Sequence, residues 1–294
     1  MVPRNISFLI FNVVTAALFY GPARESIDFS LKSEIYSYII LIPLISGYFI
    51  YVRRKRIFSE PDYSYRVGIL VTLAGIVLYF IAMKHGVRLV QNDRLALLSF
   101  SGVIFWIGGF MLFYGAKSFR AAAFPLLFLF FLAPIPNAVT EKFISLLQIG
   151  SAEAAHLFFT ITGAPLLREG FTFHLPGLSI VVAEQCSGIR SSVALVITSV
   201  IAGELFLHSG WKRLILVLSV FPVTIFKNGL RIVTLSLLGL YVDPRILDSQ
   251  AHRSGGIPFF VVALLLLAPV LWALIKSEKS KKGGMENRNN GMME

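Results

Sequence analysis

Long apolar runs separated by short polar segments dominate the sequence pattern of this chain. A helix needs about 20 residues to cross roughly 30 Å of hydrocarbon, and fewer where neighbouring helices shield its ends. Eight runs fit this expectation, although the first and the fifth are short. They are approximately Ile6–Tyr20, Glu34–Val52, Tyr65–Met83, Leu95–Gly115, Phe119–Leu132, Gly188–His208, Leu214–Tyr241 and Gly256–Ile275. The pattern predicts an all-α polytopic membrane protein with about eight transmembrane helices.

The segment 133–185, between the fifth and sixth runs, carries non-helical punctuation. Pro134 and Pro136 end one helix, and Thr140 with Glu141 can begin another. Up to Thr162 the polar residues recur every three or four positions, namely Glu141, Ser145, Gln148 and Ser151. This spacing predicts an amphipathic helix that lies in the membrane interface or lines a cavity. A ninth crossing is the alternative, because the run is long enough to span.

Two alternating stretches follow this helix, at residues 171–175 and 178–182, on either side of Pro176-Gly177. Alternation of apolar and polar residues around a Pro-Gly turn is typical of a β-hairpin. We therefore expect a short hairpin directly before the sixth transmembrane helix.

Composition supports the membrane assignment. The chain is 56% hydrophobic and only 15% charged, whereas a soluble domain has about 25% charged residues. The net charge of +11 lies in short clusters between apolar runs, which argues against nucleic-acid binding. A single cysteine excludes an internal disulfide and a Cys-based zinc site, and no glycine signature for a cofactor stands out, so we expect neither metal nor cofactor.

The basic clusters predict the topology. Arg53–Arg56 form the strongest cluster, which the positive-inside rule places in the cytoplasm. With eight crossings, the connections at 117–120 and 212–213 and the lysines of the tail also lie in the cytoplasm. Both termini are then cytoplasmic. Segment 133–185 becomes extracytoplasmic, and the loop 84–94, with three basic residues, is the exception to the rule.

The predicted organisation is one multi-pass membrane domain over residues 1–278, with a motif-bearing core at 133–256. A disordered cytoplasmic tail at 279–294 follows. The first run lacks a small-residue cleavage site, so it is expected to be a retained helix in the inner (plasma) membrane.

The residues that can carry chemistry begin with Cys186, within the polar stretch 184–192 just before the sixth run. If the helix starts near Ser187 or Gly188, its unpaired N–H groups and its dipole favour a thiolate at Cys186, and Arg190 adds positive charge. A lone cysteine can also be a small apolar filler, but the polar neighbours favour a nucleophile.

An acyl-transferring thiol needs an oxyanion stabiliser and an acid or base. Arg231 lies 17 residues after Leu214, about 26 Å along the seventh helix and near the outer face. Lys227 lies one turn below; snorkelling to headgroups is the alternative for both cations. His252 follows in the next extracytoplasmic loop. His156 and His174 compete for its role, and His208 falls at the cytoplasmic end.

The ordered set of motifs from Ala133 to Gly256 resembles the exosortase/archaeosortase family. The matching stretches are Ala133-Pro134-Ile135-Pro136-Asn137, Gly163-Ala164-Pro165, Pro176-Gly177, Glu184-Gln185-Cys186-Ser187-Gly188-Ile189-Arg190-Ser191, Asn228-Gly229-Leu230-Arg231-Ile232 and His252-Arg253-Ser254-Gly255-Gly256. The Cys-Ser-Gly-Ile-Arg element is the most specific, and the N-terminal half matches in hydropathy alone.

The resemblance implies a membrane-embedded cysteine transpeptidase or protease. Such an enzyme cleaves C-terminal sorting tails of the PEP-CTERM type from exported proteins at the outer face. It then transfers the shortened proteins to a surface acceptor, a polysaccharide or a lipid. Cys186 matches the nucleophile, Arg231 the family arginine, and His252 the histidine of bacterial members; Arg190 is an alternative oxyanion residue. Ser187, Glu184 and Asn228 are supporting positions in the same motifs. An extra C-terminal periplasmic domain is not expected.

Two other classes of function remain open at this point. A transporter or permease would use Lys227, Arg231 and Glu204 to line a pathway, although transporters place such groups near the midplane. An assembly factor for polysaccharide export would need no reactive thiol. Glu204 has no role in the sortase interpretation.

Overall fold

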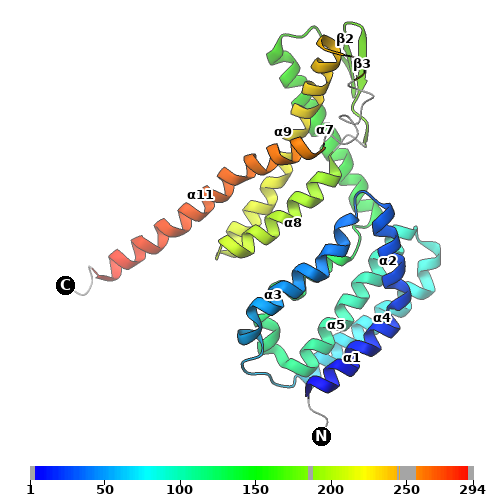
Figure 1. The fold of residues 1–294 in the computed structure, drawn as a ribbon, viewed down its shortest axis with the longest axis vertical. Coiled ribbons are helices and arrows are strands. Elements are labelled where there is room, and N and C mark those ends of the chain that lie inside the picture. The colour runs from blue at the N-terminus through cyan, green and yellow to red at the C-terminus, as the bar shows by residue number, and fades with distance from the viewer. Residues whose placement is uncertain (1–3, 185–187, 244, 246–255, 291–294) are drawn as a thin grey trace. The chain divides into compact units, whose positions relative to one another are not determined.

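The computed structural model describes residues 4–184, 188–243, 245 and 256–290. The chain forms two compact units, Met1–Thr140 and Glu141–Glu294. Helices dominate both units, and the described residues contain one small sheet (Figure 1). The predicted all-α polytopic membrane fold is confirmed.

Unit 1 consists of helices and single 3-10 turns. They are α1 (Arg4–Leu18), α2 (Tyr20–Lys32), η1 (Ser37–Ile40), α3 (Leu41–Ile57), α4 (Tyr65–His85), η2 (Gly86–Arg88), α5 (Gln91–Ala121), α6 (Ala123–Phe128) and η3 (Leu129–Leu132). Helices α4 and α5 pack closely because glycines line their contact: a Cβ at Gly75 would lie 2.6 Å from the backbone nitrogen of Phe105. Small residues permit such close packing between membrane helices.

Unit 2 holds most of α7 (Asn137–Thr162), then β1 (Leu167–Glu169), β2 (Thr172–Leu175), β3 (Leu178–Val181), α8 (Ile189–Phe206), α9 (Gly210–Tyr241) and α11 (Gly256–Asn290). The predicted hairpin is confirmed as β2 and β3, which pair antiparallel around Gly177 with its φ of +77°. Strand β1, which was not predicted, pairs antiparallel with β2 and completes a sheet in the order β1-β2-β3.

Six helices among the described residues are long and apolar enough to cross a membrane: α4, α5, α7, α8, α9 and the part Ile257–Lys279 of α11. The pair α1 and α2, bent by 63°, makes a seventh if it is one span. The protein is therefore a multi-pass membrane protein. The prediction of about eight spans stays a prediction, as does the single membrane domain.

Four predicted boundaries differ from the structure. The first run breaks at Phe19, and a second helix, α2, follows the bend. Helix α5 continues beyond its predicted end through a break at Gly115, whose φ is +79°. The fifth run forms only the short apolar segment Ala123–Leu132. Helix α11 continues to Asn290, into the expected tail.

Helix α7 begins at Asn137, three residues earlier than the sequence predicts, because α5 supplies the partners of its first turn. The backbone N–H of Asn137 donates to Asp93 Oδ1 at 2.7 Å, and Asn92 Nδ2 donates to the carbonyl of Ile135 at 2.7 Å. Helix α7 passes the length and hydropathy test for a span. Its placement in the interface or across the membrane stays a prediction.

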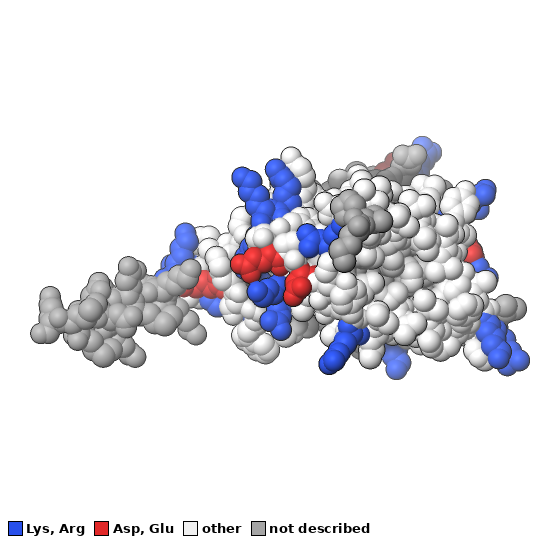
Figure 2. Space-filling view, turned by 90° about the horizontal axis from the view of Figure 1, so that it is seen from below, with Lys and Arg blue, Asp and Glu red and all other residues white. Residues whose placement is uncertain are grey.

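Basic residues gather at one end of unit 1. Arg4 donates to the carbonyl of Pro61 at 3.1 Å, and Lys117 pairs with Glu60 at 3.1 Å. The last turn of α3, which carries the cluster Arg54–Arg56, leads directly into this loop. Three segments assigned to the cytoplasm from sequence therefore share one end of the unit. Most of the face in Figure 2 is uncharged, and its charged side chains stand in small groups.

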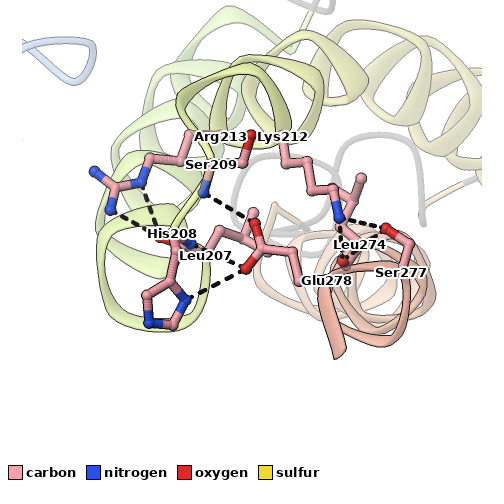
Figure 3. Close-up of polar contacts among 8 residues, drawn as sticks. All are labelled: Leu207, His208, Ser209, Lys212, Arg213, Leu274, Ser277 and Glu278. Atoms are coloured by element: carbon pink, nitrogen blue, oxygen red, sulfur yellow. Dashed lines mark hydrogen bonds and ion pairs between the residues drawn. The ribbon is translucent and has the colours of Figure 1, made fainter. Parts of the chain in front are cut away.

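Unit 2 has its own polar end at the turn between α8 and α9 (Figure 3). The carboxylate of Glu278 on α11 accepts hydrogen bonds from the backbone N–H groups of His208 at 3.1 Å and Ser209 at 2.9 Å. A carboxylate at a helix N-terminus satisfies open donors and complements the helix dipole. Glu278 therefore fixes α11 against the start of α9.

Two further basic residues strengthen this end (Figure 3). Lys212 donates to Ser277 Oγ at 2.6 Å, and Arg213 donates to the carbonyl of Leu207 through Nε at 2.9 Å and Nη2 at 2.7 Å. The predicted cytoplasmic lysines and arginines thus tie together α8, α9 and α11 at one end of unit 2, and the candidate site lies at the other end of α8.

Candidate active site

The start of α8 is shaped by Gly188. Its φ of +80° and ψ of 16° are left-handed, a conformation that glycine adopts without strain. Its carbonyl accepts hydrogen bonds from Ser191 Oγ at 2.9 Å and from the N–H of Ser192 at 3.0 Å. The expectation that the sixth helix begins near residue 188 is confirmed, so residue 186 lies directly ahead of a helix N-terminus.

Lys227 reaches this start from α9. Its ammonium donates to Ser191 Oγ at 2.7 Å, and the residue is only 2% exposed. A Cβ on Gly188 would lie 3.4 Å from Lys227 Nζ, so the backbone at Gly188 passes close to the cation. The snorkelling alternative for Lys227 does not hold, because the side chain is buried inside the unit.

The next two residues of α9 contact α7. Asn228 is fully buried and donates through Nδ2 to Ser151 Oγ at 2.9 Å. A Cβ on Gly229 would lie 2.6 Å from the Cβ of Ala154, so glycine allows the two helices to approach. Asn228, predicted as a supporting residue, therefore fixes α9 against α7 beside the start of α8.

The sheet and α7 fix the chain at the end of β3. Phe173 of β2 is fully buried, with its ring centroid 5.5 Å from that of Phe159 on α7. After β3, the N–H of Val182 donates to the carbonyl of Phe171, and the carbonyl of Val182 accepts a hydrogen bond from Gln148 of α7 at 2.7 Å. Residues 183–187 therefore connect two positions, Val182 and Gly188, that are each held by α7 or α9.

An ion pair joins the sheet to α7. Arg168 of β1 donates to both carboxylate oxygens of Glu153, at 3.1 and 2.6 Å. The hydrogen bond to Glu153 raises the pKa of Arg168. Arg168 is also within 5.5 Å of the Phe173 ring centroid, a cation–π geometry. The edge of the sheet is thereby fixed to the same helix that supports Asn228.

The structure brings together part of the predicted site. Arg231 lies one turn after Lys227, on the same face of α9, and is partly buried. Arg190 lies in the first turn of α8, and Glu184 lies ahead of it; both are exposed. Cys186, Ser187 and His252 lie outside the described residues, so their roles stay predictions.

The competing histidines have partners in the sheet or on the surface. His174 Nδ1 is 2.8 Å from Ser179 Oγ across β2 and β3, and its Nε2 is 3.6 Å from Glu169. His156 is exposed on α7. Among the described residues, no group of three or more His, Cys, Asp or Glu side chains is arranged to hold a metal ion.

Two residues of the site, Gln148 and Ser151, were visible in the sequence only as polar positions in an apolar helix, and Ser191 was visible as part of the motif 184–191 without an assigned role. Gln148 and Ser151 belong to the polar stripe predicted for α7. At these two positions the polar side chains point into the unit: Gln148 donates to the carbonyl of Val182, and Ser151 accepts a hydrogen bond from Asn228. Of the two settings predicted for this stripe, contact with the interior describes these positions better than contact with headgroups.

The sequence profile of the transmembrane exosortases matches residues 30–269, which is most of the chain. The protein belongs to the transmembrane exosortase family. Exosortases are cysteine-dependent membrane transpeptidases or proteases that act on exported proteins with C-terminal sorting signals. No curated protein and no solved structure matches the chain. The match also covers part of unit 1, a region that resembles the family in hydropathy alone and carries none of the matching motifs.

Proposed function

We propose that this exosortase cleaves the C-terminal sorting tail of exported proteins at the outer face of the plasma membrane and transfers them to a surface acceptor. The observation that carries the proposal is the buried Lys227–Ser191 contact, with Arg231 one turn away, at the N-terminus that directly follows Cys186. Clustered cations at a helix start are the setting in which a thiol becomes a usable nucleophile.

The proposed first step is acylation of Cys186. Its thiolate attacks the scissile carbonyl carbon, a C–S bond forms, and Arg231 stabilises the negative charge that develops on the oxygen. His252 gives a proton to the departing amine as the C–N bond breaks. The products of this step are a thioester on Cys186 and the released tail.

The second step returns the enzyme to its starting state. An amine of the acceptor, or water, attacks the thioester carbonyl, the C–S bond breaks, and Cys186 leaves as the thiolate. The proton lost by the attacking nucleophile passes to His252. Neither step requires a metal or a cofactor in the chemistry proposed here.

The orientation is part of the proposal. The basic ends of both units are cytoplasmic, and the sheet with the start of α8 faces outward. Arg94, in the segment 84–94 that is an exception to the positive-inside rule, lies in the first turn of α5 and pairs with Glu25, which offsets part of the excess positive charge there. Both termini are then cytoplasmic, and the substrates reach the site after export.

The test is co-expression with a reporter that ends in a Pro-containing motif, a transmembrane helix and a basic cluster. The reporter should shorten with the wild-type chain and remain uncut with Cys186→Ala at equal expression. Shortening in both strains, compared with a strain lacking the enzyme, would show that Cys186 is not the nucleophile.

A further inference from the structure

The outer edge of β3 is a feature that the proposed reaction does not use. In an antiparallel pair, residues that exchange backbone hydrogen bonds with the partner strand alternate with residues whose backbone groups point away from it. The N–H of Val182 donates to the carbonyl of Phe171 at 2.9 Å, and the pairing of β3 with β2 continues from there to the turn. The backbone groups of Ser179 and Val181 therefore point away from β2.

Three of these outward groups have no hydrogen-bond partner in the part of the chain that the structure describes. They are the N–H and the carbonyl of Ser179 and the N–H of Val181, whereas the carbonyl of Val181 accepts from the N–H of Ala183 at 3.0 Å. A donor, an acceptor and a second donor thus lie in line over about 7 Å. Such an edge is a template for a further strand, and an extended backbone of about three residues matches it.

The opposite edge of the sheet, β1, is less suited to accept a strand. Arg168 pairs with Phe173, whose backbone faces β3, so Arg168 is the one residue of β1 whose backbone points away from β2. Its charged side chain is held by Glu153 of α7. Short strands and charged residues are common means of protecting an edge from pairing. Strand β3 carries no charged residue, so it is the open edge of the sheet.

The open edge ends beside the start of α8. Gln148 of α7 donates to the carbonyl of Val182 at 2.7 Å, and Ser151 of the same helix accepts from Asn228 at 2.9 Å. The two positions on α7 are about 4.5 Å apart along the helix axis. A Cβ on Gly188 would lie 3.4 Å from Asn228 Oδ1. The end of β3 and the start of α8 are therefore held by one turn of α7, and a peptide paired with β3 would run alongside the candidate site.

We propose that the outer edge of β3 is the docking surface for an extended, uncharged segment of the exported substrate, which adds to the sheet as a fourth strand. In this mode of recognition, main-chain hydrogen bonds supply affinity and contacts of alternate side chains supply specificity. The side chain of Val181, which is 59% exposed, offers such an apolar contact. The inference rests on the proposed function, because it names the surface that holds the substrate peptide for cleavage.

Photo-crosslinking tests this contact without requiring cleavage. The full-length Cys186→Ala enzyme carries benzoylphenylalanine in place of Val181 and is co-expressed with the tail-bearing reporter. The matched control carries it in place of Leu167 of β1, because the two side chains are similarly exposed, at 59% and 62%. An added strand lies about 5 Å from β3 but about 14 Å from β1. Position 181 should therefore crosslink to the reporter about fivefold more than position 167, within the segment ahead of the reporter's transmembrane helix.

Val181→Pro tests the backbone pairing. Proline removes the outward N–H and leaves the hydrogen bonds to β2 in place, since an edge strand accepts proline where the N–H faces away from the sheet. The KM for the reporter should rise about tenfold, because backbone hydrogen bonds to the substrate are lost, while kcat should change by less than about threefold. Val181→Thr keeps both the N–H and the branched shape, so its kinetic constants should match those of the wild type.

Equal crosslinking from positions 181 and 167, crosslinks from 181 only to a second copy of the enzyme, or an unchanged KM in folded Val181→Pro would overturn the inference. If Val181→Pro does not fold, the crosslinks decide. This failure is separable from failure of the proposed function. If cleavage requires Cys186 but Val181→Pro keeps the wild-type KM, the enzyme is a cysteine transpeptidase that holds its substrate elsewhere. If position 181 crosslinks to the reporter but Cys186→Ala still cuts, the docking surface exists and the proposed function is wrong.

Discussion

Glu204, near the end of α8, forms an ion pair with Arg213 in the first turn of α9. The Glu204 side chain is only 6% exposed, and Arg213 also donates to the carbonyl of Leu207 in the turn between the two helices. This pair closes the α8–α9 turn at the end of unit 2 opposite the start of α8. Glu204, which the transporter alternative uses to line a pathway, therefore has a structural partner.

Glu204→Gln should lower stability but leave cleavage intact. The change removes the charge from a nearly buried carboxylate that accepts a charged hydrogen bond, a loss of roughly 1.5–3 kcal/mol. Thermal unfolding in detergent measures this effect. The control is Glu60→Gln, whose ion pair with Lys117 is about three-quarters exposed and should change the unfolding free energy by less than about 0.5 kcal/mol.

The same variants separate an enzyme from a transporter. If Glu204 lined a transport pathway, Glu204→Gln would abolish function at temperatures where the protein is fully folded. Normal reporter processing by Glu204→Gln in the membrane, together with a reduced unfolding temperature, agrees with the structural role.

Gly188→Ala should reduce both stability and activity. The left-handed φ of +80° costs a residue with a Cβ about 1–2 kcal/mol, and the new methyl group would lie 3.4 Å from Lys227 Nζ and from Asn228 Oδ1. Gly177→Ala is the matched variant, since Gly177 has a φ of +77° but nothing within 4 Å of a Cβ. Unfolding curves and reporter cleavage measure the two effects.

Both glycine variants should lose similar stability, whereas only Gly188→Ala should also lose cleavage beyond its loss of folded protein. Equal activity per folded molecule in the two variants would argue that the start of α8 has no role in the reaction.

Arg231→Lys should reduce cleavage by about 10²–10³-fold, because a bidentate guanidinium that stabilises an oxyanion is poorly replaced by an ammonium. Arg190→Lys, at an exposed position in the first turn of α8, should reduce it by less than about tenfold. Initial rates of reporter cleavage at equal enzyme levels provide the comparison. The reverse ranking would assign the oxyanion role to Arg190.

Cys186 should react with a membrane-impermeant maleimide added to intact cells, because the proposed orientation places it outside. The control uses the cysteine-free Cys186→Ala background with Ser59→Cys, an exposed position just after the basic cluster of α3. That variant should react only after the membrane is permeabilised. Labelling of Ser59→Cys but not of Cys186 in intact cells would show that the topology is the reverse of the proposed one.

The fold class and the hairpin were predictable because they depend on local patterns. The length of the apolar runs predicted the membrane helices, and the alternation of apolar and polar residues around Pro176-Gly177 predicted β2 and β3. Strand β1 was missed because its three residues show no alternation long enough to recognise; it is held by pairing with β2 and by the ion pair of Arg168 with Glu153. Helix α2 was missed as well, although Gly21 and Pro22, just after Phe19, mark the bend.

The candidate site was predictable as a set of residues but not as a set of contacts. The helix start at Gly188 followed from sequence, and so did the common face of Lys227 and Arg231. The partners of Lys227 and Asn228, which are Ser191 and Ser151, depend on how α7, α8 and α9 align across one another. Nothing in the periodicity of a single helix encodes that register.

We expect acyl transfer to proceed through a thioester on Cys186. Purified enzyme and a tail-bearing reporter, incubated with hydroxylamine as a small amine nucleophile, test it most directly, because hydroxylamine converts a thioester into a hydroxamate. The wild type should release reporter ending in a hydroxamate, identified by mass spectrometry, and Cys186→Ala should release none. Cleavage by Cys186→Ala, or a wild-type product that ends only in a carboxylate at saturating hydroxylamine, would contradict it.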